Sequence, residues 1–516
     1  MKRFVRATTS FTLTVLMSVP STVLAARKDK NKEKEEEEAP ASESARQEYS
    51  DKDKKTMAEI AQRPEVQKEI EAAWQAQRRQ DVVEAFNVNT GRTPGYNMYP
   101  NPIVNDYVNT LGQRLVPKDS PNLYAFRLLL DPMPRAESLS TGTIYVSTGL
   151  VSMLDNEAQL AYILAHEVAH VERGHMYQRI RNPIIEERLA FEKQKQAAKK
   201  KAIFGALGAV AGAAVGAAAG GNRSQNALIG AEIGLLGGIV TGSIVTRGKF
   251  QPTEWDTLQE DEADETGLGL ILDQKFDPRE VPKTYARLDT LVTRDSRVGL
   301  GFMGSKQRVK ERTANIERLL AGALKVKVDA QMQAGGLVGG SPEFALLMSA
   351  LKRDNGVEAL DYDLFAMAKE NLQDAANLRS NDSRVHYYLG KVTSLTARTD
   401  EDRQAAASEF LTAIRYDAKR GSYPEPHLQR ALHLIKQNNS SNQGEIQDEL
   451  KAYVTLYQRQ HAGNLPSNMH IIYDYFLLAG DTAWYVPPFS VVQTKYVDWP
   501  LAVVPAASRK TLAIQK

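Results

Sequence analysis

The chain of 516 residues contains no cysteine. Without cysteine, both a disulfide framework and a lipid-anchoring cysteine near the N-terminus are excluded. Stability must therefore come from the hydrophobic core or from a bound metal. Histidine is also scarce, with eight residues in the whole chain, so two histidines at a meaningful spacing indicate a site rather than chance.

An excess of charge of either sign is lacking as well. Lysine and arginine number 65 and aspartate and glutamate 63, which gives a formal net charge of +2. This balance gives no reason to expect nucleic acid as a partner. With 42% hydrophobic and 25% charged residues, the composition is that of a globular protein, and the length favours about three structural units.

The first residues have the pattern of an export signal. Basic residues precede an apolar stretch over residues 11–19, and small or apolar residues lead up to Ala25. We therefore predict that residues 1–25 are a cleaved signal peptide. A retained signal anchor is the alternative, but the apolar stretch is far shorter than the roughly 20 residues that span a bilayer. Residues 26–56 are dominated by Lys, Glu, Asp, Ser and Ala, which predicts a charged, disordered leader.

Residues 57–340 are predicted to form the main domain. Helical patterns occupy residues 57–90 and 104–116, and strand-like segments follow at 124–130 and 143–147. A further helix is expected to begin at Asp155 or Asn156 and to carry an apolar stripe. We expect this helix to pack on the core along the stripe and to leave another face free. The stripe consists of Leu160, Ile163, Leu164, Val168 and Val171.

A segment rich in glycine and alanine interrupts this domain at residues 201–246. Its glycines recur twice at every fourth position, which lines one helix face with glycine and lets two backbones approach closely. We predict a glycine-zipper helical hairpin that contacts a membrane; a soluble packed hairpin and a pore-forming one are the alternatives. The repeated glycines are Gly208, Gly212, Gly216, Gly220, Gly230, Gly234, Gly238 and Gly242.

Residues 341–516 are predicted to form a helical C-terminal region. Segments 366–391 and 405–436 each have the pattern of helix, turn, helix and recur at roughly 40 residues, close to the tetratricopeptide period. The expected fold class is therefore mainly α with a small β-sheet, plus an α-helical, repeat-like C-terminal region.

The motif with the clearest chemistry is His166-Glu167-Val168-Ala169-His170. Within a helix, a spacing of four residues places both imidazoles on one face, where they can share a zinc ion. Glu167 lies beside that face and can act as the general base that takes a proton from the attacking water.

A hydrolytic zinc site needs a third protein ligand. No histidine occurs between His175 and His386, and we predict that Glu260 is the ligand. Asp264, one helical turn later, is expected to accept a hydrogen bond from a ligand histidine and to fix its tautomer. Asp261 and Glu262 remain alternative ligands. His175 is expected to be structural, because five residues after His170 it leaves the binding face.

These motifs resemble a known family. HEVAHVERGH, followed about ninety residues later by EDEADETGLGL, is similar to the HExxH and ExxxD motifs of the HtpX and CAAX prenyl protease family of zinc metallopeptidases, and the likeness covers roughly residues 96–320. It implies an α+β gluzincin core, one Zn²⁺ per chain and endopeptidase activity on polypeptides. The matching upstream stretch implies an edge strand along which substrate pairs, made of Thr143, Ile144, Tyr145 and Val146.

Two features depart from the family pattern. Many exported relatives carry a His-Pro pair in the loop after the helix of the third ligand, but residues 301–306 contain no histidine. Arg312 matches an arginine that follows this loop, for which a transition-state or a structural role is expected. The second departure is the glycine hairpin, which lies where membrane-embedded relatives carry transmembrane helices.

The signal and the repeat-like tail are similar to those of the exported, BepA-type members of the family. This resemblance implies a periplasmic, membrane-associated endopeptidase that cleaves unfolded or misassembled envelope proteins. The alternative is a chaperone or assembly factor whose tail binds clients and whose zinc site is incidental or regulated.

Overall fold

The structure is a computed structural model that describes residues 49–92, 97–211, 255–294, 306–418 and 421–481. The chain divides into two units, Met1–Lys54 and Lys55–Lys516, and the site lies in the second. Most of the predicted signal peptide and leader, most of the predicted glycine hairpin, and the loop at 301–305 lie outside the described residues. Among the helices that the structure describes, none is both long and apolar enough to cross a bilayer.

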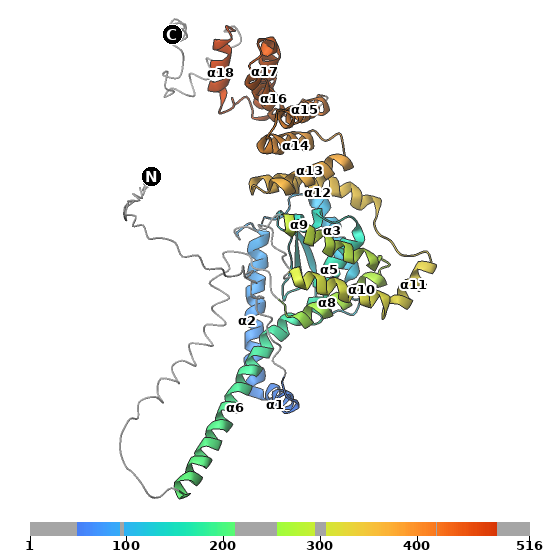
Figure 1. The fold of residues 1–516 in the computed structure, drawn as a ribbon, viewed down its shortest axis with the longest axis vertical. Helices are drawn as coiled ribbons and strands as arrows, with labels where there is room; N and C mark the ends of the chain where they lie inside the picture. Colours follow the sequence, from blue (N-terminus) through green and yellow to red (C-terminus); the bar gives the residue numbers. More distant parts are fainter. Residues whose placement is uncertain (1–48, 93–96, 212–254, 295–305, 419–420, 482–516) are drawn as a thin grey trace, which may run out of the picture. The chain divides into compact units, whose positions relative to one another are not determined.

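The described part of the chain is mainly α-helical with one small sheet, as predicted (Figure 1). The elements up to residue 333 are α1 (Asp51–Ala61), α2 (Pro64–Asn89), α3 (Pro102–Leu115), β1 (Ala125–Leu129), β2 (Ala136–Ser138), β3 (Thr143–Ser147), α4 (Thr148–Ser152), α5 (Glu157–Glu172), α6 (His175–Ala211), α8 (Thr257–Asp273), η1 (Pro278–Glu280), α9 (Val281–Arg294), α10 (Lys306–Ala321) and α11 (Lys325–Gln333).

The C-terminal elements follow as α12 (Pro342–Asp361), α13 (Phe365–Leu378), α14 (Ser383–Thr396), α15 (Asp400–Asp417), α16 (Glu425–Gln437), η3 (Ser440–Asn442), α17 (Gln443–Gln460) and α18 (Met469–Leu478).

The sheet has the strand order β1-β3-β2, with β3 parallel to β1 and antiparallel to β2. The prediction that Thr143–Val146 form an edge strand is therefore wrong, because β3 is paired on both sides. Among the described residues, the free edge next to α5 belongs to β2, which the sequence did not reveal. This strand is short, contains no β-branched residue and follows a loop with two prolines, so its local pattern does not favour a strand.

The hairpin between β2 and β3 is held by the turn and by helix α2. Gly142 adopts φ +81°, and a Cβ there would lie 2.1 Å from the carbonyl oxygen of Leu123. The buried carboxylate of Asp81 on α2 accepts a hydrogen bond of 2.9 Å from the backbone N–H of Ser140. Val88 of α2 also packs with Leu139 on this side of the sheet. Helix α2 therefore holds the turn that follows the edge strand β2.

Helix α5 passes through the centre of the main core. The side chain of Asn156 caps it by accepting from the N–H of Gln159, and every residue from Glu157 to His170 is buried. The expectation that one face of α5 stays free is therefore wrong. The apolar stripe does face the core, but the remaining faces are covered by β2, α6, α8 and α9.

Helix α12 belongs both to the main core and to the C-terminal region. Phe344, Met348 and Leu351 are part of the same buried cluster as α3, α5 and the sheet. Asn355, fully buried, accepts from Thr148 Oγ1 at 2.9 Å and donates to Ser152 Oγ at 3.1 Å on α4. A boundary at residue 340 would therefore cut through packing that the core shares with the tail.

The C-terminal helices pack as consecutive pairs, α12/α13, α14/α15 and α16/α17. In the first pair Gly356 faces Leu372 and the Ala368 carbonyl, and in the second Gly390 faces Phe410 and the Ala406 carbonyl. The same positions thus make the same close contact one repeat apart. This recurrence supports the predicted helical repeat.

Candidate metal centre

The candidate centre lies where α5 and α8 pack against each other. Gly267 on α8 permits the close approach, because a Cβ there would lie 3.1 Å from the backbone nitrogen of His166. Helix α8 begins with a capping box in which Asp256 and Gln259 bond reciprocally to the backbone, so its first turn is fixed. That turn carries Glu260 to the two histidines of α5.

Three ligand-type side chains meet at this contact. His166, His170 and Glu260 are buried, and each offers a potential ligand atom within 4.8 Å of the others. The two Nε2 atoms lie 3.0 Å apart, and Glu260 Oε2 lies 3.3 Å from Nε2 of His166. The structure thus brings together the two histidines of the motif and the predicted glutamate.

The outer nitrogen of His166 faces the carboxylate of Asp264. Nδ1 of His166 lies 2.9 Å from Asp264 Oδ1. Burial acts to lower the pKa of His166, but its hydrogen bonds to Asp264 and Glu260 raise that pKa to about 9. The two carboxylates therefore favour a positive charge at the His166 ring, and the same negative potential favours a bound cation.

Arg312 of α10 ties the two carboxylates of α8 together. Fully buried, it contacts Asp264 through Nε at 2.8 Å and Nη2 at 2.5 Å, and its Nη1 lies 2.9 Å from Glu260 Oε2. Burial acts to raise the pKa of Asp264, but the charge and hydrogen bonds of Arg312, with those of His166, hold it well below its usual range. Asp264 therefore stays ionised as an acceptor.

Two tyrosines complete the surroundings of Asp264. Tyr162 donates to Asp264 Oδ1 at 2.6 Å, and Tyr285 donates to the same oxygen at 3.2 Å. The hydroxyls of the two tyrosines also lie 2.7 Å apart. Asp264 is thus held by groups from α5, α9 and α10, so its orientation toward His166 is fixed by the surrounding core.

Glu167 has the environment of a general base. It is 1% exposed, and burial raises its pKa to about 7, although the charge of His166 and a hydrogen bond from Ser138 lower it. Its Oε2 has no hydrogen-bond partner among the described residues. Because Ser138 ends β2 and bonds to Glu167, this glutamate lies beside the outer edge of the sheet.

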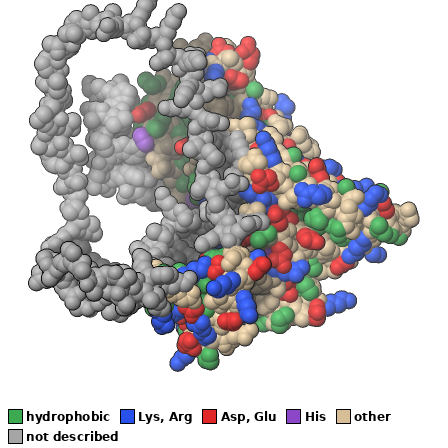
Figure 2. Space-filling view, turned by 60° about the horizontal axis from the view of Figure 1, so that its bottom comes forward, with side chains coloured by type: hydrophobic (Ala, Val, Ile, Leu, Met, Phe, Trp, Pro, Cys, Tyr) green, Lys and Arg blue, Asp and Glu red, His purple; other side chains and the backbone are tan. Residues whose placement is uncertain are grey.

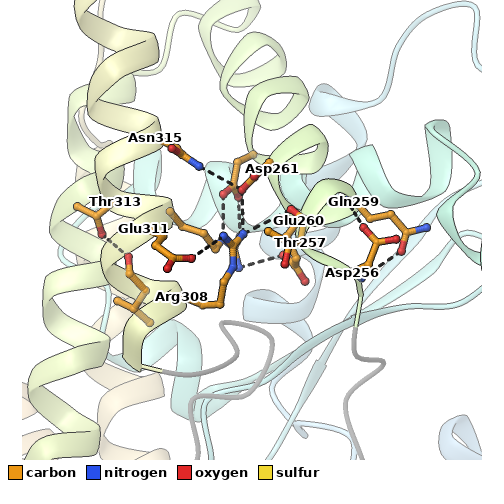
Figure 3. Close-up of polar contacts among 12 residues, drawn as sticks. Asp256, Thr257, Gln259, Glu260, Asp261, Arg308, Glu311, Thr313 and Asn315 are labelled. Atoms are coloured by element: carbon orange, nitrogen blue, oxygen red, sulfur yellow. Dashed lines mark hydrogen bonds and ion pairs between the residues drawn. The ribbon is translucent and has the colours of Figure 1, made fainter. Parts of the chain in front are cut away.

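The alternative ligands contact residues other than His166 and His170. Asp261 accepts from Arg308 at 2.8 Å and from Asn315 at 3.3 Å, both on α10, as Figure 3 shows. Glu262 lies 3.4 Å from Nε2 of His175 and 3.5 Å from Arg173. Of the three acidic neighbours at 260–262, only Glu260 reaches the cluster.

Sequence reasoning missed the surroundings of His170. Its Nδ1 lies 2.8 Å from Nδ1 of His175, and its ring stacks on Trp255 with centroids 4.5 Å apart. Burial first, then the charges of His166, His175 and Arg312, hold the pKa of His170 well below its usual range. The scarcity of histidine was the one available signal for His175, whereas Trp255, Tyr162 and Tyr285 carried none.

The residues present fit a zinc ion. Two imidazoles and one carboxylate, with an adjacent glutamate, are the donor set of hydrolytic zinc sites. Glu167 Oε2 is buried and has no hydrogen-bond partner among the described residues, whereas Glu260 Oε2 is already paired with Arg312 Nη1 at 2.9 Å. A cation would be held by the two Nε2 atoms and the Glu260 carboxylate.

Comparison with known proteins found relatives that match part of the chain. The chain is 26% identical over 189 residues to a protein described as "Putative beta-barrel assembly-enhancing protease" from Vibrio cholerae serotype O1. It is 27% identical over 189 residues to the beta-barrel assembly-enhancing proteases of Yersinia pestis and Escherichia coli (strain K12). The aligned residues make up 36% of this chain and 33% of each relative, so the chain matches about a third of their length.

The match to a family model is confined to the core. Residues 117–320 match the model of peptidase family M48, a range that includes the sheet, α5, α8 and α10 and therefore every side chain of the candidate centre. The region from α12 onward lies outside the match. Over residues 117–320 the chain is thus similar to peptidase family M48.

Proposed function

We propose that this chain is a zinc-dependent endopeptidase, with His166, His170 and Glu260 as the ligands of one Zn²⁺ and Glu167 as the general base. The buried convergence of two imidazole Nε2 atoms and one carboxylate, next to a buried glutamate, is the observation that carries the proposal. When bound, zinc supplies a Lewis acid that polarises a peptide carbonyl and eases ionisation of water.

The protein groups supply positioning and proton transfer. Glu167 accepts a proton from the attacking water and donates it to the leaving amine, and a pKa of about 7 suits both directions. An extended polypeptide would pair along the free edge of β2, which ends at Ser138 beside Glu167. Asp264 and Arg312 contact His166 and Glu260 and hold them in place.

We further propose that the substrates are unfolded or misassembled envelope proteins and that the chain acts in the periplasm, in association with a membrane through residues 201–246. The names of the relatives, which refer to beta-barrel assembly, and the export-like N-terminus support this role. On the face drawn in Figure 2, basic and acidic side chains intermingle, which matches a partner without strong charge of one sign.

The test compares wild type with Glu167→Gln on an unfolded outer-membrane β-barrel protein. Both should bind about one zinc per chain by metal analysis, because the ligands are unchanged. Cleavage by the variant should fall by roughly 10²- to 10⁴-fold, since proton transfer is lost. Equal cleavage by both proteins would contradict the assignment of Glu167. Suppression of client aggregation without cleavage by either protein would favour the chaperone alternative.

A further inference from the structure

The two histidines of the centre have different outer partners. Asp264 holds Nδ1 of His166, whereas Nδ1 of His170 meets no carboxylate in the part of the chain that the structure describes and lies 2.8 Å from Nδ1 of His175. His175 is the first residue of α6, and Gly174 at φ +65° makes the turn that follows α5. This positive φ, which glycine adopts readily, returns the chain so that His175 meets the ligand five residues before it.

The contact between two nitrogens restricts the tautomers of both rings. If Nε2 of His170 binds a metal, its lone pair is used there, so the ring proton lies on Nδ1. That N–H must donate, and the partner at 2.8 Å is Nδ1 of His175, which must therefore accept. Nε2 of His175 then carries the proton and faces Glu262 Oε2 at 3.4 Å.

The surroundings hold His175 in place to accept this bond. The residue is fully buried, and Gln259, from the capping box of α8, lies within 3.4 Å of its carbonyl oxygen. Trp255 stacks on His170 and lies against His175, with ring centroids 6.0 Å apart. The start of α8 therefore packs around both rings, and the chain of contacts runs from His170 through His175 to Glu262.

We propose that His175 is a positioning residue for the metal: it fixes the Nδ1–H tautomer and the ring orientation of His170, as Asp264 does for His166. This inference rests on the proposed zinc site. The outer hydrogen bond of His166 is then stronger than that of His170, because an ionised carboxylate accepts a hydrogen bond more strongly than a neutral imidazole. His170 therefore depends on a neutral acceptor that is held by a weakly bonded and partly exposed Glu262.

The test measures zinc affinity of the full-length metal-free protein by competition with a chromophoric chelator. His175→Phe keeps an aromatic ring but removes the acceptor, and we expect zinc to bind roughly 10- to 100-fold more weakly. His175→Asn, which places an amide near the position of Nδ1, should retain most of the wild-type affinity. His427→Phe, which removes a histidine bonded to Glu449 in the tail, is the matched control and should bind zinc like wild type.

A second measurement separates positioning from general loss of structure. The visible spectrum of the cobalt-substituted protein reports ligand geometry, and it should change in His175→Phe but not in His427→Phe. If His175→Phe does not fold, His175→Asn and His175→Gln provide the comparison. The asparagine amide lies near the position of Nδ1, whereas the glutamine amide lies near the position of Nε2. The His175→Asn variant should therefore bind zinc more tightly than the His175→Gln variant.

The outcomes distinguish this inference from the proposed function. Wild type that binds no zinc would overturn the metal site itself. Wild type with one zinc, together with unchanged affinity and cobalt spectrum in His175→Phe, would overturn the role of His175 alone. Equal zinc affinities of the Asn and Gln variants would have the same consequence.

Discussion

Histidine faces a carboxylate in both the main core and the C-terminal helix pairs. In the core, His166 lies 2.9 Å from Asp264, with side chains 1% and 3% exposed. In the tail, His386 lies 2.7 Å from Glu409, with side chains 12% and 30% exposed, and bonds the Ser380 carbonyl through Nε2. The difference lies in the second nitrogen, which meets other ligand atoms in the core and the backbone in the tail.

The tail pair also recurs, whereas the core pair does not. His427 faces Glu449 at 2.5 Å across α16 and α17, as His386 faces Glu409 across α14 and α15. The two pairs lie about 40 residues apart in sequence, one repeat. The histidine–glutamate contacts of the tail recur at the repeat period and therefore help to pack the helix pairs. The His166–Asp264 contact of the core instead belongs to one site.

The largest effect is expected when the C-terminal helices are removed from the main core. We expect a chain that ends at residue 340 to lose its cooperative melting transition and its zinc. Without α12, the core loses Phe344, Met348 and Leu351, and burial of each such side chain contributes roughly 1.5 to 3 kcal/mol. Calorimetry and metal analysis would measure both losses.

The matched truncation ends at residue 380 and keeps the first helix pair. Because α12 and its partner α13 remain, this chain should stay folded and bind about one zinc. If the chain that ends at residue 340 melted like this longer one, α12 would be dispensable and the core would end where the sequence pattern first placed its boundary.

Local patterns predicted the elements of the site better than their arrangement. The spacing of His166 and His170, and of Glu260 and Asp264, follows from helix geometry and could be read directly. The central position of β3 and the role of His175 depend on contacts between segments distant in sequence or across a turn. Strand order and ring contacts of this kind have no local periodicity, so the sequence placed the edge in the wrong strand.

The next effect concerns the carboxylates of the paired histidines. Asp264→Asn should weaken zinc binding by roughly 10- to 100-fold, because the neutral amide supports His166 less well and weakens the contact with Arg312. Glu409→Gln, the equivalent change in the tail, should leave zinc affinity unchanged. Chelator competition measures both, and a similar loss in the two variants would mean that zinc affinity reports overall stability rather than the contact.

A smaller effect is expected from the glycines of the tail. A Cβ at Gly356 would lie 2.8 Å from Leu372, and one at Gly390 would lie 2.7 Å from Phe410. Gly356→Ala and Gly390→Ala should therefore each destabilise the protein by about 1 to 3 kcal/mol through overpacking. Gly444→Ala is the control, since nothing lies within 4 Å of its added Cβ. Urea unfolding followed by circular dichroism measures the free energy of unfolding of each variant. Equal values for Gly356→Ala, Gly390→Ala and Gly444→Ala would show that the helix pairs are loosely packed.

The smallest effect is a pH dependence confined to the tail. Burial acts to lower the pKa of His386, but its hydrogen bond to Glu409 outweighs burial and raises that pKa above the usual 6.5. A group whose pKa is raised on folding stabilises the protein fully below its unfolded pKa, and this contribution is lost as the pH rises through the folded value. His386→Gln should therefore lower the melting temperature more at pH 5.5 than at pH 9, by an amount that corresponds to at most about 1 kcal/mol for a partly exposed pair.

Glu409→Gln should show the same trend. The double variant should be little less stable than either single variant, because both changes remove the same interaction. A difference between wild type and His386→Gln that does not vary with pH would show that the pair holds the helices by packing alone.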